Sequence, residues 1–196
     1  MEGGVKELLH LAIAYLCLSF AFAAAVSGRV WLLRPFSLPA ITALWEPFRL
    51  ALLALSPSFI LHELAHRTVA RANGVAAEFR LSWFGTAICV ILATFTGILF
   101  GAVGGVVVET ITDESLTGKI AAAGPLTNLL LIPVFWLVGG TVGRMGAFIN
   151  AALAFFNTLP FDPLDGAKVA RASKIGWLIL FVASVVTYTH VLTLVR

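Results

Sequence analysis

The sequence is short of charge. Of its 196 residues, 13 are Lys or Arg and 10 are Asp or Glu, so only 12% are charged, whereas 60% are hydrophobic and the mean hydropathy is +0.98. Ordinary soluble domains carry about one-quarter charged residues. This deficit excludes an ordinary soluble protein and indicates that the chain lies in a lipid bilayer.

Concentrated basic charge and paired cysteines are also lacking. The 13 basic residues are scattered and the formal net charge is only +3, so we assign no nucleic-acid partner. Cys17 and Cys89 each lie in an apolar run, and neither has a second cysteine or a histidine at metal-site spacing. This excludes a cysteine-based metal site, and we interpret both residues as small buried side chains.

What the sequence does contain is a series of long apolar stretches. Six of them lack Asp, Glu, Lys and Arg and approach the length of about 20 residues that crosses a bilayer. They are Leu8 to Gly28, Leu50 onward through an interrupting His-Glu cluster, Leu81 to Val108, Ile120 to Gly143, Met145 to Phe161 and Ile175 to Val195. Hydropathy alone therefore predicts up to six transmembrane helices.

The third stretch differs from the others. Its flanks, Ala76 to Ser82 and Gly105 to Thr112, have the alternating or β-branched character of strands. Five glycines that weaken a continuous helix lie between or at these flanks: Gly85, Gly97, Gly101, Gly104 and Gly105. We therefore predict an all-α membrane protein. It would be a polytopic bundle of five to six transmembrane helices, with a small strand or re-entrant element in the third stretch.

A metal-binding pattern interrupts the second apolar stretch, where residues 62 to 66 read His-Glu-Leu-Ala-His. On a helix, His62 and His66 lie one turn apart on the same face and can bind one metal ion, while Glu63 can reach a metal-bound water. Ionisable residues are costly at membrane depth, so they indicate function. The alternative is a set of interfacial polar residues paired with Arg67.

A catalytic zinc site normally has three protein ligands, so one is missing. His10 and His190 are weak candidates, because lone histidines in apolar helices usually serve packing. The segment from Asn157 to Gly166 is a better source, since its two prolines break a helix around Asp162 and Asp165. A plain turn at the membrane surface is the alternative interpretation of this segment.

Three motifs together resemble the site-2 protease family of intramembrane zinc peptidases. They are HELAH at 62 to 66, AGPLTN at 123 to 128 and NTLPFDPLDG at 157 to 166, in the order of the family. The resemblance covers about residues 50 to 171. It implies that His62, His66 and Asp165 bind one zinc ion, that Glu63 is the general base, and that Asn157 supports the substrate or transition state. Gly124, Pro125 and Asn128 match a helix-packing element near the site.

The resemblance departs from the family in two places. About 45 residues separate Gly74 from Lys119, longer than the hairpin region of compact members, and only one apolar span follows Asp165. One zinc can contact all three ligands only if the chain crosses the membrane an even number of times between them. We therefore expect the third stretch not to span, which also places more basic residues on the inner side.

The function that follows is an intramembrane zinc metalloprotease, with residues 1–196 as one transmembrane metalloprotease domain. We expect it to be a multi-pass protein of the cell membrane that cuts transmembrane protein substrates and opens its site toward the cytoplasm. The oligomeric state stays open. Alternatives are a prenyl-type membrane protease that uses Glu109 or Glu114 as third ligand, a zinc-binding transporter, and an inactive partner protein.

Overall fold

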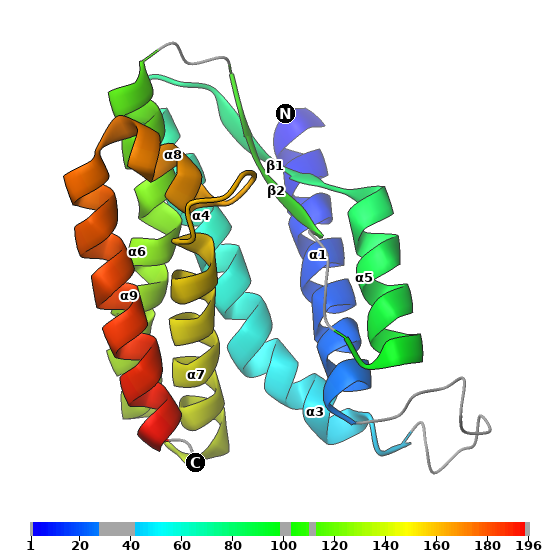
Figure 1. Ribbon diagram of the computed structural model, residues 1–196. Helices are drawn as coiled ribbons and strands as arrows, with labels where there is room; N and C mark the ends of the chain where they lie inside the picture. Colours follow the sequence, from blue (N-terminus) through cyan, green and yellow to red (C-terminus); the bar gives the residue numbers. More distant parts are fainter. Residues whose placement is uncertain (1, 28–41, 99–102, 110–112, 195–196) are drawn as a thin grey trace. The chain divides into compact units, whose positions relative to one another are not determined.

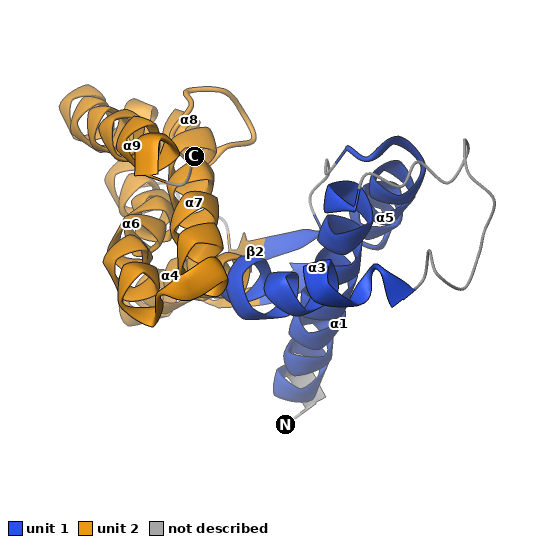
Figure 2. Ribbon diagram, turned by 90° about the horizontal axis from the view of Figure 1, so that it is seen from below, with its two compact units in different colours: residues 1–57, 79–105 blue, residues 58–78, 106–196 orange. Residues whose placement is uncertain are grey.

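A computed structural model describes residues 2–27, 42–98, 103–109 and 113–194. Figure 1 shows the order of the helices and strands along the chain. The chain divides into two compact units, one made of residues 1–57 and 79–105 and the other of residues 58–78 and 106–196 (Figure 2).

The first unit is built around the long helix α1. Its elements are α1 (Glu2–Val26), α3 (Trp45–Leu50), a π-helical turn η2 (Ala51–Leu55) and α5 (Trp83–Thr96). Helix α1 packs against α5, α3 and η2. The Ser82 hydroxyl caps α5 by accepting a hydrogen bond from Gly85 N–H, and Gly97 ends the helix at φ 75°. Glycine adopts this left-handed conformation without the steric cost of a side chain.

The predicted strands are present at both flanks of α5. Strand β1 (Ala77–Leu81) pairs with β2 (Gly104–Val108). Hydrogen bonds from Ser82 N–H to Val103 O and from Glu109 N–H to Ala76 O show that the strands run antiparallel. The prediction for this region was therefore right about the strands, and the residues between them contain a 14-residue helix. Residues 110–112, which the prediction included in the second strand, lie outside the described part.

The second unit holds the remaining helices. These are α4 (Ser56–Ala72, from residue 58 onward), α6 (Glu114–Val138), α7 (Gly140–Asn157), α8 (Asp165–Ala172) and α9 (Lys174–Leu194). Helix α6 packs against α7 and α8, and α9 packs against the same two helices. In Figure 1 the short helix α8 lies at one end of α6 and α9. The chain turns between α6 and α7 at Gly139 and Gly140, both at positive φ, rather than at Arg144 as the apolar stretches suggested.

Four helices of the described residues are long and apolar enough to cross a membrane: Gly4–Val26, Trp45–Ala72, Glu114–Val138 and Lys174–Leu194. Helix α7 has 18 residues but carries Arg144, Asn150 and Asn157, which lower its hydropathy. Helix α5 is apolar and shorter, with 14 residues. The molecule is thus a helical membrane protein with a small strand element between α4 and α6, as the sequence predicts.

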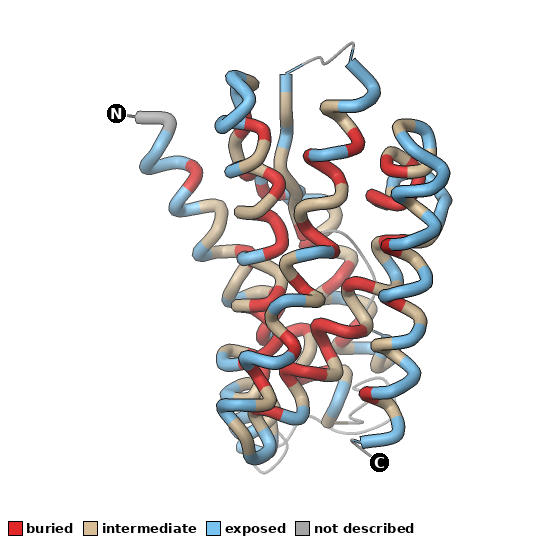
Figure 3. The backbone as a smooth tube through the Cα atoms, turned by 90° about the vertical axis from the view of Figure 1, so that its left-hand side faces the viewer, coloured by how far each residue is buried: buried red, intermediate tan, exposed pale blue. Residues whose placement is uncertain are grey.

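Small residues let the helices of the second unit approach closely. A Cβ at Gly146 would overlap the Phe135 ring, and one at Gly118 would overlap Ala172. Such small residues are typical of helix contacts inside membranes. In Figure 3 the helix that ends at C, α9, carries few buried residues.

Candidate metal centre

Helix α4 carries the first two metal-ligand candidates on one face. His62 and His66 are separated by one helical turn, and both are buried, with relative exposures of 4% and 7%. Their rings meet edge to face, and the two Nε2 atoms lie 3.1 Å apart. Two imidazole nitrogens pointing at the same place are what a shared metal ion requires.

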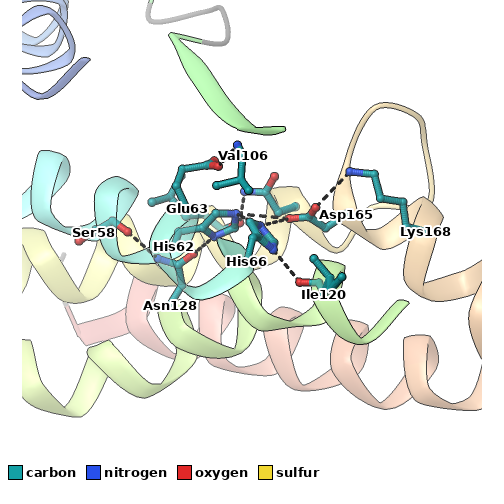
Figure 4. Close-up of polar contacts among 11 residues, drawn as sticks. Ser58, His62, Glu63, His66, Val106, Ile120, Asn128, Asp165 and Lys168 are labelled. Carbon is teal, nitrogen blue, oxygen red and sulfur yellow. Dashed lines mark hydrogen bonds and ion pairs between the residues drawn. The ribbon is translucent and has the colours of Figure 1, made fainter. Parts of the chain in front are cut away.

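Asp165, the first residue of α8, places its carboxylate next to both of these Nε2 atoms. Its Oδ2 lies 3.3 Å from His62 Nε2 and 3.1 Å from His66 Nε2. Figure 4 shows the three side chains directed at one another. Among the described residues, these three form the only group of three or more His, Cys, Asp or Glu side chains that could hold a metal ion.

The spacing of these atoms fits a zinc ion. Bond lengths of about 2.0–2.2 Å and tetrahedral angles place two ligand atoms of one zinc about 3.3 Å apart. The three distances observed here are 3.1, 3.1 and 3.3 Å. Two imidazoles and one carboxylate are also a donor set typical of a catalytic zinc, which keeps a fourth position for water or substrate.

The other nitrogen of each imidazole is held by a hydrogen-bond acceptor. His66 Nδ1 lies 2.7 Å from the Ile120 carbonyl oxygen, and His62 Nδ1 lies 2.6 Å from Asn128 Oδ1. A carbonyl oxygen can only accept, so His66 Nδ1 carries the proton and Nε2 is left for the metal. Metal-binding histidines almost always have a partner of this kind on the second nitrogen.

Gly124 on α6 makes room for the two rings. A Cβ built on Gly124 would overlap His66 Nε2 and lie 2.5 Å from His62 Nε2. Real Cβ atoms do not approach other atoms so closely, so the packing of α6 against α4 at this point requires glycine. The AGPLTN segment therefore forms a wall of the metal centre.

Comparison with known proteins agrees with this centre. The chain is 37% identical over 186 residues to the predicted zinc metalloprotease MJ0611 of Methanocaldococcus jannaschii, covering 89% of this chain and 88% of that protein. The chain belongs to the site-2 protease family. Two further proteins with predicted zinc metalloprotease names match the chain: Rip3 of Mycobacterium tuberculosis, 33% identical over 60% of this chain, and sll0528 of Synechocystis, 31% identical over 61%.

The chain spans only 29% of Rip3 and 30% of sll0528. No family model and no solved structure matches it. Family membership and the buried group of His62, His66 and Asp165 together identify zinc as the cofactor of this site-2 protease family member.

The two aspartates of the family motif have separate surroundings. Asp165 Oδ2 faces the histidines, and its Oδ1 lies 3.5 Å from Lys168 Nζ. Asp162 is exposed and forms a bidentate ion pair with Arg171, in which Nη1 lies 2.9 Å from Oδ2 and Nη2 lies 3.2 Å from Oδ1. The hydrogen bonds from Arg171 hold the pKa of the Asp162 carboxyl below its usual value. The structure therefore brings only one of the two aspartates to the metal centre.

Glu63, the expected general base of the family, lies beside the centre on α4 and is 9% exposed. Its Oε2 accepts a hydrogen bond of 2.9 Å from Val106 N–H (Figure 4). In an antiparallel pair, alternate residues turn their N–H groups away from the partner strand. Val106 lies on the outward-facing set of β2, so the strand edge fixes the orientation of the Glu63 carboxylate.

Asn157 is the one expected site residue that the structure does not join to the others. Its side-chain Nδ2 donates to Leu153 O, 3.0 Å away in the same helix. The other ligand candidates from the sequence, His10, His190, Glu109 and Glu114, are not part of any metal-ligand group among the described residues.

Several contacts of the centre have no strong signal in the sequence. The family resemblance predicts a helix-packing role for Asn128, yet its side chain contacts a histidine directly. Lys168 and the Val106 N–H were not singled out, and neither was Asn150, which joins Asn128 from α7. The available signal for Asn150 was its presence in an apolar helix, because polar side chains inside membranes usually have a partner.

Proposed function

We propose that this chain is an intramembrane metalloprotease that hydrolyses peptide bonds within or near transmembrane helices of membrane-protein substrates. The observation that carries the proposal is the convergence of two imidazole nitrogens and one carboxylate oxygen, with separations of 3.1 to 3.3 Å. All three residues are buried, in a chain of which four described helices are long and apolar enough to span a bilayer. In this proposal His62, His66 and Asp165 hold the zinc.

The residues of the chain have separate roles in hydrolysis. Zinc, when bound, lowers the pKa of a coordinated water toward about 7 and polarises the scissile carbonyl. Glu63 accepts the proton of the attacking water and later delivers it to the leaving amine. Its Oε2 is held by Val106 N–H, so the carboxylate has a fixed orientation before substrate arrives. Asn157, the last residue of α7, stabilises the bound substrate or the transition state.

The order of elements supports a site that opens toward the cytoplasm. His66 lies six residues before the end of α4, and Asp165 follows α7, so two crossings, α6 and α7, would separate them. With the N-terminus inside, five spans would leave eight of the 13 basic residues on the inner side. We therefore propose a multi-pass protein of the cell membrane, formed by one domain over residues 1–196, with a transmembrane protein as substrate.

Replacing Glu63 with glutamine tests the proposal. A glutamine amide has nearly the same shape but cannot take a proton, so cleavage of a membrane-embedded test helix should fall about 100- to 10,000-fold while bound zinc stays near one per chain. Purified wild-type and Glu63→Gln proteins would be assayed side by side in liposomes, with zinc measured by mass spectrometry. A Glu63→Gln protein with wild-type cleavage would contradict the proposal, and is the result expected of a zinc carrier.

A further inference from the structure

A continuous network of buried polar side chains ties three helices of the second unit together behind His62. Asn128 on α6 donates to Asn150 Oδ1 on α7 over 2.9 Å and to the Ser58 carbonyl over 3.3 Å. Asn150 in turn donates to Ser58 Oγ over 2.7 Å and to the Gly146 carbonyl over 2.8 Å. Asn128, Asn150 and Ser58 are all fully buried, so water does not compete for these bonds.

The hydrogen bonds of this network can run in only one direction. The carbonyl oxygen of Gly146 accepts and never donates, so the Asn150 NH₂ group must face it and Oδ1 must face Asn128. The Asn128 NH₂ group then faces Asn150 Oδ1 and the Ser58 carbonyl, both of which accept. This leaves the Asn128 Oδ1 atom directed at His62 Nδ1, 2.6 Å away.

The direction of the network determines which nitrogen of His62 carries the proton. Because Asn128 Oδ1 can only accept, the neutral imidazole must carry its proton on Nδ1. Its Nε2 atom, which faces Asp165 and His66, then presents a lone pair, as a metal ligand must. A flipped Asn128 would set its NH₂ group against His62 Nδ1, favour the other tautomer and place a proton in the metal position.

We propose that Asn150 is a positioning residue, which fixes His62 in its metal-binding tautomer through Asn128. The inference rests on the proposed function in one respect, namely that His62 is a zinc ligand. It adds a residue outside the three family motifs: Asn150 lies on α7, 22 residues beyond Asn128. The hydrogen bonds of Asn150 go to Asn128, Ser58 and Gly146 and not to a proposed metal ligand, so it acts through the amide of Asn128.

The hydrogen bonds from Asn150 through Asn128 to His62 form a relay, and His66 provides an internal control for it. Its Nδ1 faces the backbone carbonyl of Ile120 directly, over 2.7 Å, so its tautomer needs no second side chain. Loss of the relay should therefore change His62 and leave His66 as it is. General loosening of the helices would disturb both histidines.

The test is a measurement of the histidine tautomers in the full-length chain, labelled with nitrogen-15 on histidine, in detergent and with a chelator present. In the wild type both His62 and His66 should be protonated on Nδ1. In Asn150→Leu, which removes the acceptor for Asn128, His62 should populate both tautomers while His66 keeps its own. The zinc affinity, measured by competition with a chromophoric chelator, should fall about 10-fold, the lower end of the effect of outer-shell partners.

Two further variants separate positioning from packing. Asn150→Asp keeps an oxygen toward Asn128 whatever its protonation, so it should retain the wild-type tautomer of His62 even if it lowers thermal stability. Ser184→Ala removes a fully buried polar side chain that donates to Leu180 O within α9, outside the network, and should leave both tautomers and the zinc affinity unchanged.

The inference is overturned if His62 of the wild type lacks a proton on Nδ1, a result that needs no variant to fold. It is also overturned if Asn150→Leu matches the wild type in both tautomer and zinc affinity, or if His62 and His66 change together. A His62→Ala variant distinguishes these failures from failure of the proposed function. If His62→Ala binds zinc as the wild type does, the metal assignment itself is wrong and the relay has no role.

Discussion

Each compact unit contains a buried cluster of hydrogen-bonded polar side chains. The two clusters differ in the group that the last member of each one contacts. In the first unit, Ser19 Oγ and Ser56 Oγ lie 2.6 Å apart, and one hydroxyl donates to the other. Both oxygens also lie within hydrogen-bond distance of the Tyr15 carbonyl, at 2.8 and 3.0 Å, and the Tyr15 hydroxyl donates to the Leu52 carbonyl. Hydroxyls and backbone carbonyls thus satisfy one another. In an apolar environment such bonds join helices.

The cluster of the second unit has the same ingredients but a different terminus. Ser58, Asn150 and Asn128 also bridge helices, yet the last acceptor of the series faces His62 rather than a backbone group. A buried polar network is therefore not in itself a sign of function. The histidine at its end, which we propose as a zinc ligand, is what distinguishes this network from one that only holds helices together.

The largest effect on zinc affinity should come from a substitution that displaces His62 and His66. Gly124→Ala adds a Cβ that overlaps both imidazoles, so the rings must move and zinc affinity should fall on the order of 100-fold or more, with cleavage lost in parallel. Zinc content after chelator challenge measures this. Gly4→Ala, where a Cβ meets nothing within 4 Å, is the matched control and should bind zinc as the wild type does. Equal zinc retention by both variants would argue against the close packing of α6 on α4.

An intermediate effect should follow from Asn157→Ala, which tests whether an asparagine outside the network acts on the substrate. If the amide supports the transition state, kcat should fall about 100-fold, as when one hydrogen-bond donor to the developing charge is removed. Zinc content should stay at one per chain, because the Asn157 side chain donates its hydrogen bond to Leu153 O in its own helix and not to a metal-ligand candidate. A fall in zinc content would instead make Asn157 part of the metal centre.

A smaller effect should follow from Ser19→Ala in the cluster of the first unit. This change removes the 2.6 Å contact with Ser56 and should lower stability by about 1 kcal/mol. Thermal unfolding in detergent would show the loss, while zinc affinity and cleavage rate should match those of the wild type. A loss of zinc in Ser19→Ala would contradict the claim that only the cluster of the second unit affects zinc binding.

The smallest effect should come from Asp162→Ala. Because Arg171 lowers the pKa of Asp162, their ion pair stabilises the fold at pH values above the ordinary carboxyl pKa, and this contribution disappears as the pH falls through the lowered pKa. Both side chains are exposed, so solvent and salt weaken the pair. Unfolding curves of wild type and variant should nearly coincide at neutral pH and converge fully in acid. A variant that separates from the wild type only in acid would contradict this.

Much of the metal centre could be predicted from the sequence because its rules are local. A spacing of four residues puts His62 and His66 on one helix face, and the number of crossings limits which remote carboxylate can reach them. The strands were predictable from β-branched residues next to glycines. Helix α5 was not, because the glycines there do not interrupt it: Gly85 lies in its first turn and Gly97 forms its end.

The hydrogen-bond partners could not be predicted in the same way. Asn150 and Ser58 are 92 residues apart in the chain, and Glu63 and Val106 are 43 apart. No local pattern records which of several buried polar residues will meet after the helices pack. Glu63, Asn128 and Asn150 each depend on helix or strand packing that only the folded chain determines.

The most direct test of the account is the zinc stoichiometry of Asp165→Ala beside Asp162→Ala. Both aspartates lie in the same broken segment, but only Asp165 approaches the imidazoles, to 3.1 and 3.3 Å. Wild type and Asp162→Ala should each hold one zinc per chain after dialysis against a chelator, and Asp165→Ala should hold almost none. Full zinc in Asp165→Ala, or its loss from Asp162→Ala alone, would contradict the assignment of the metal centre.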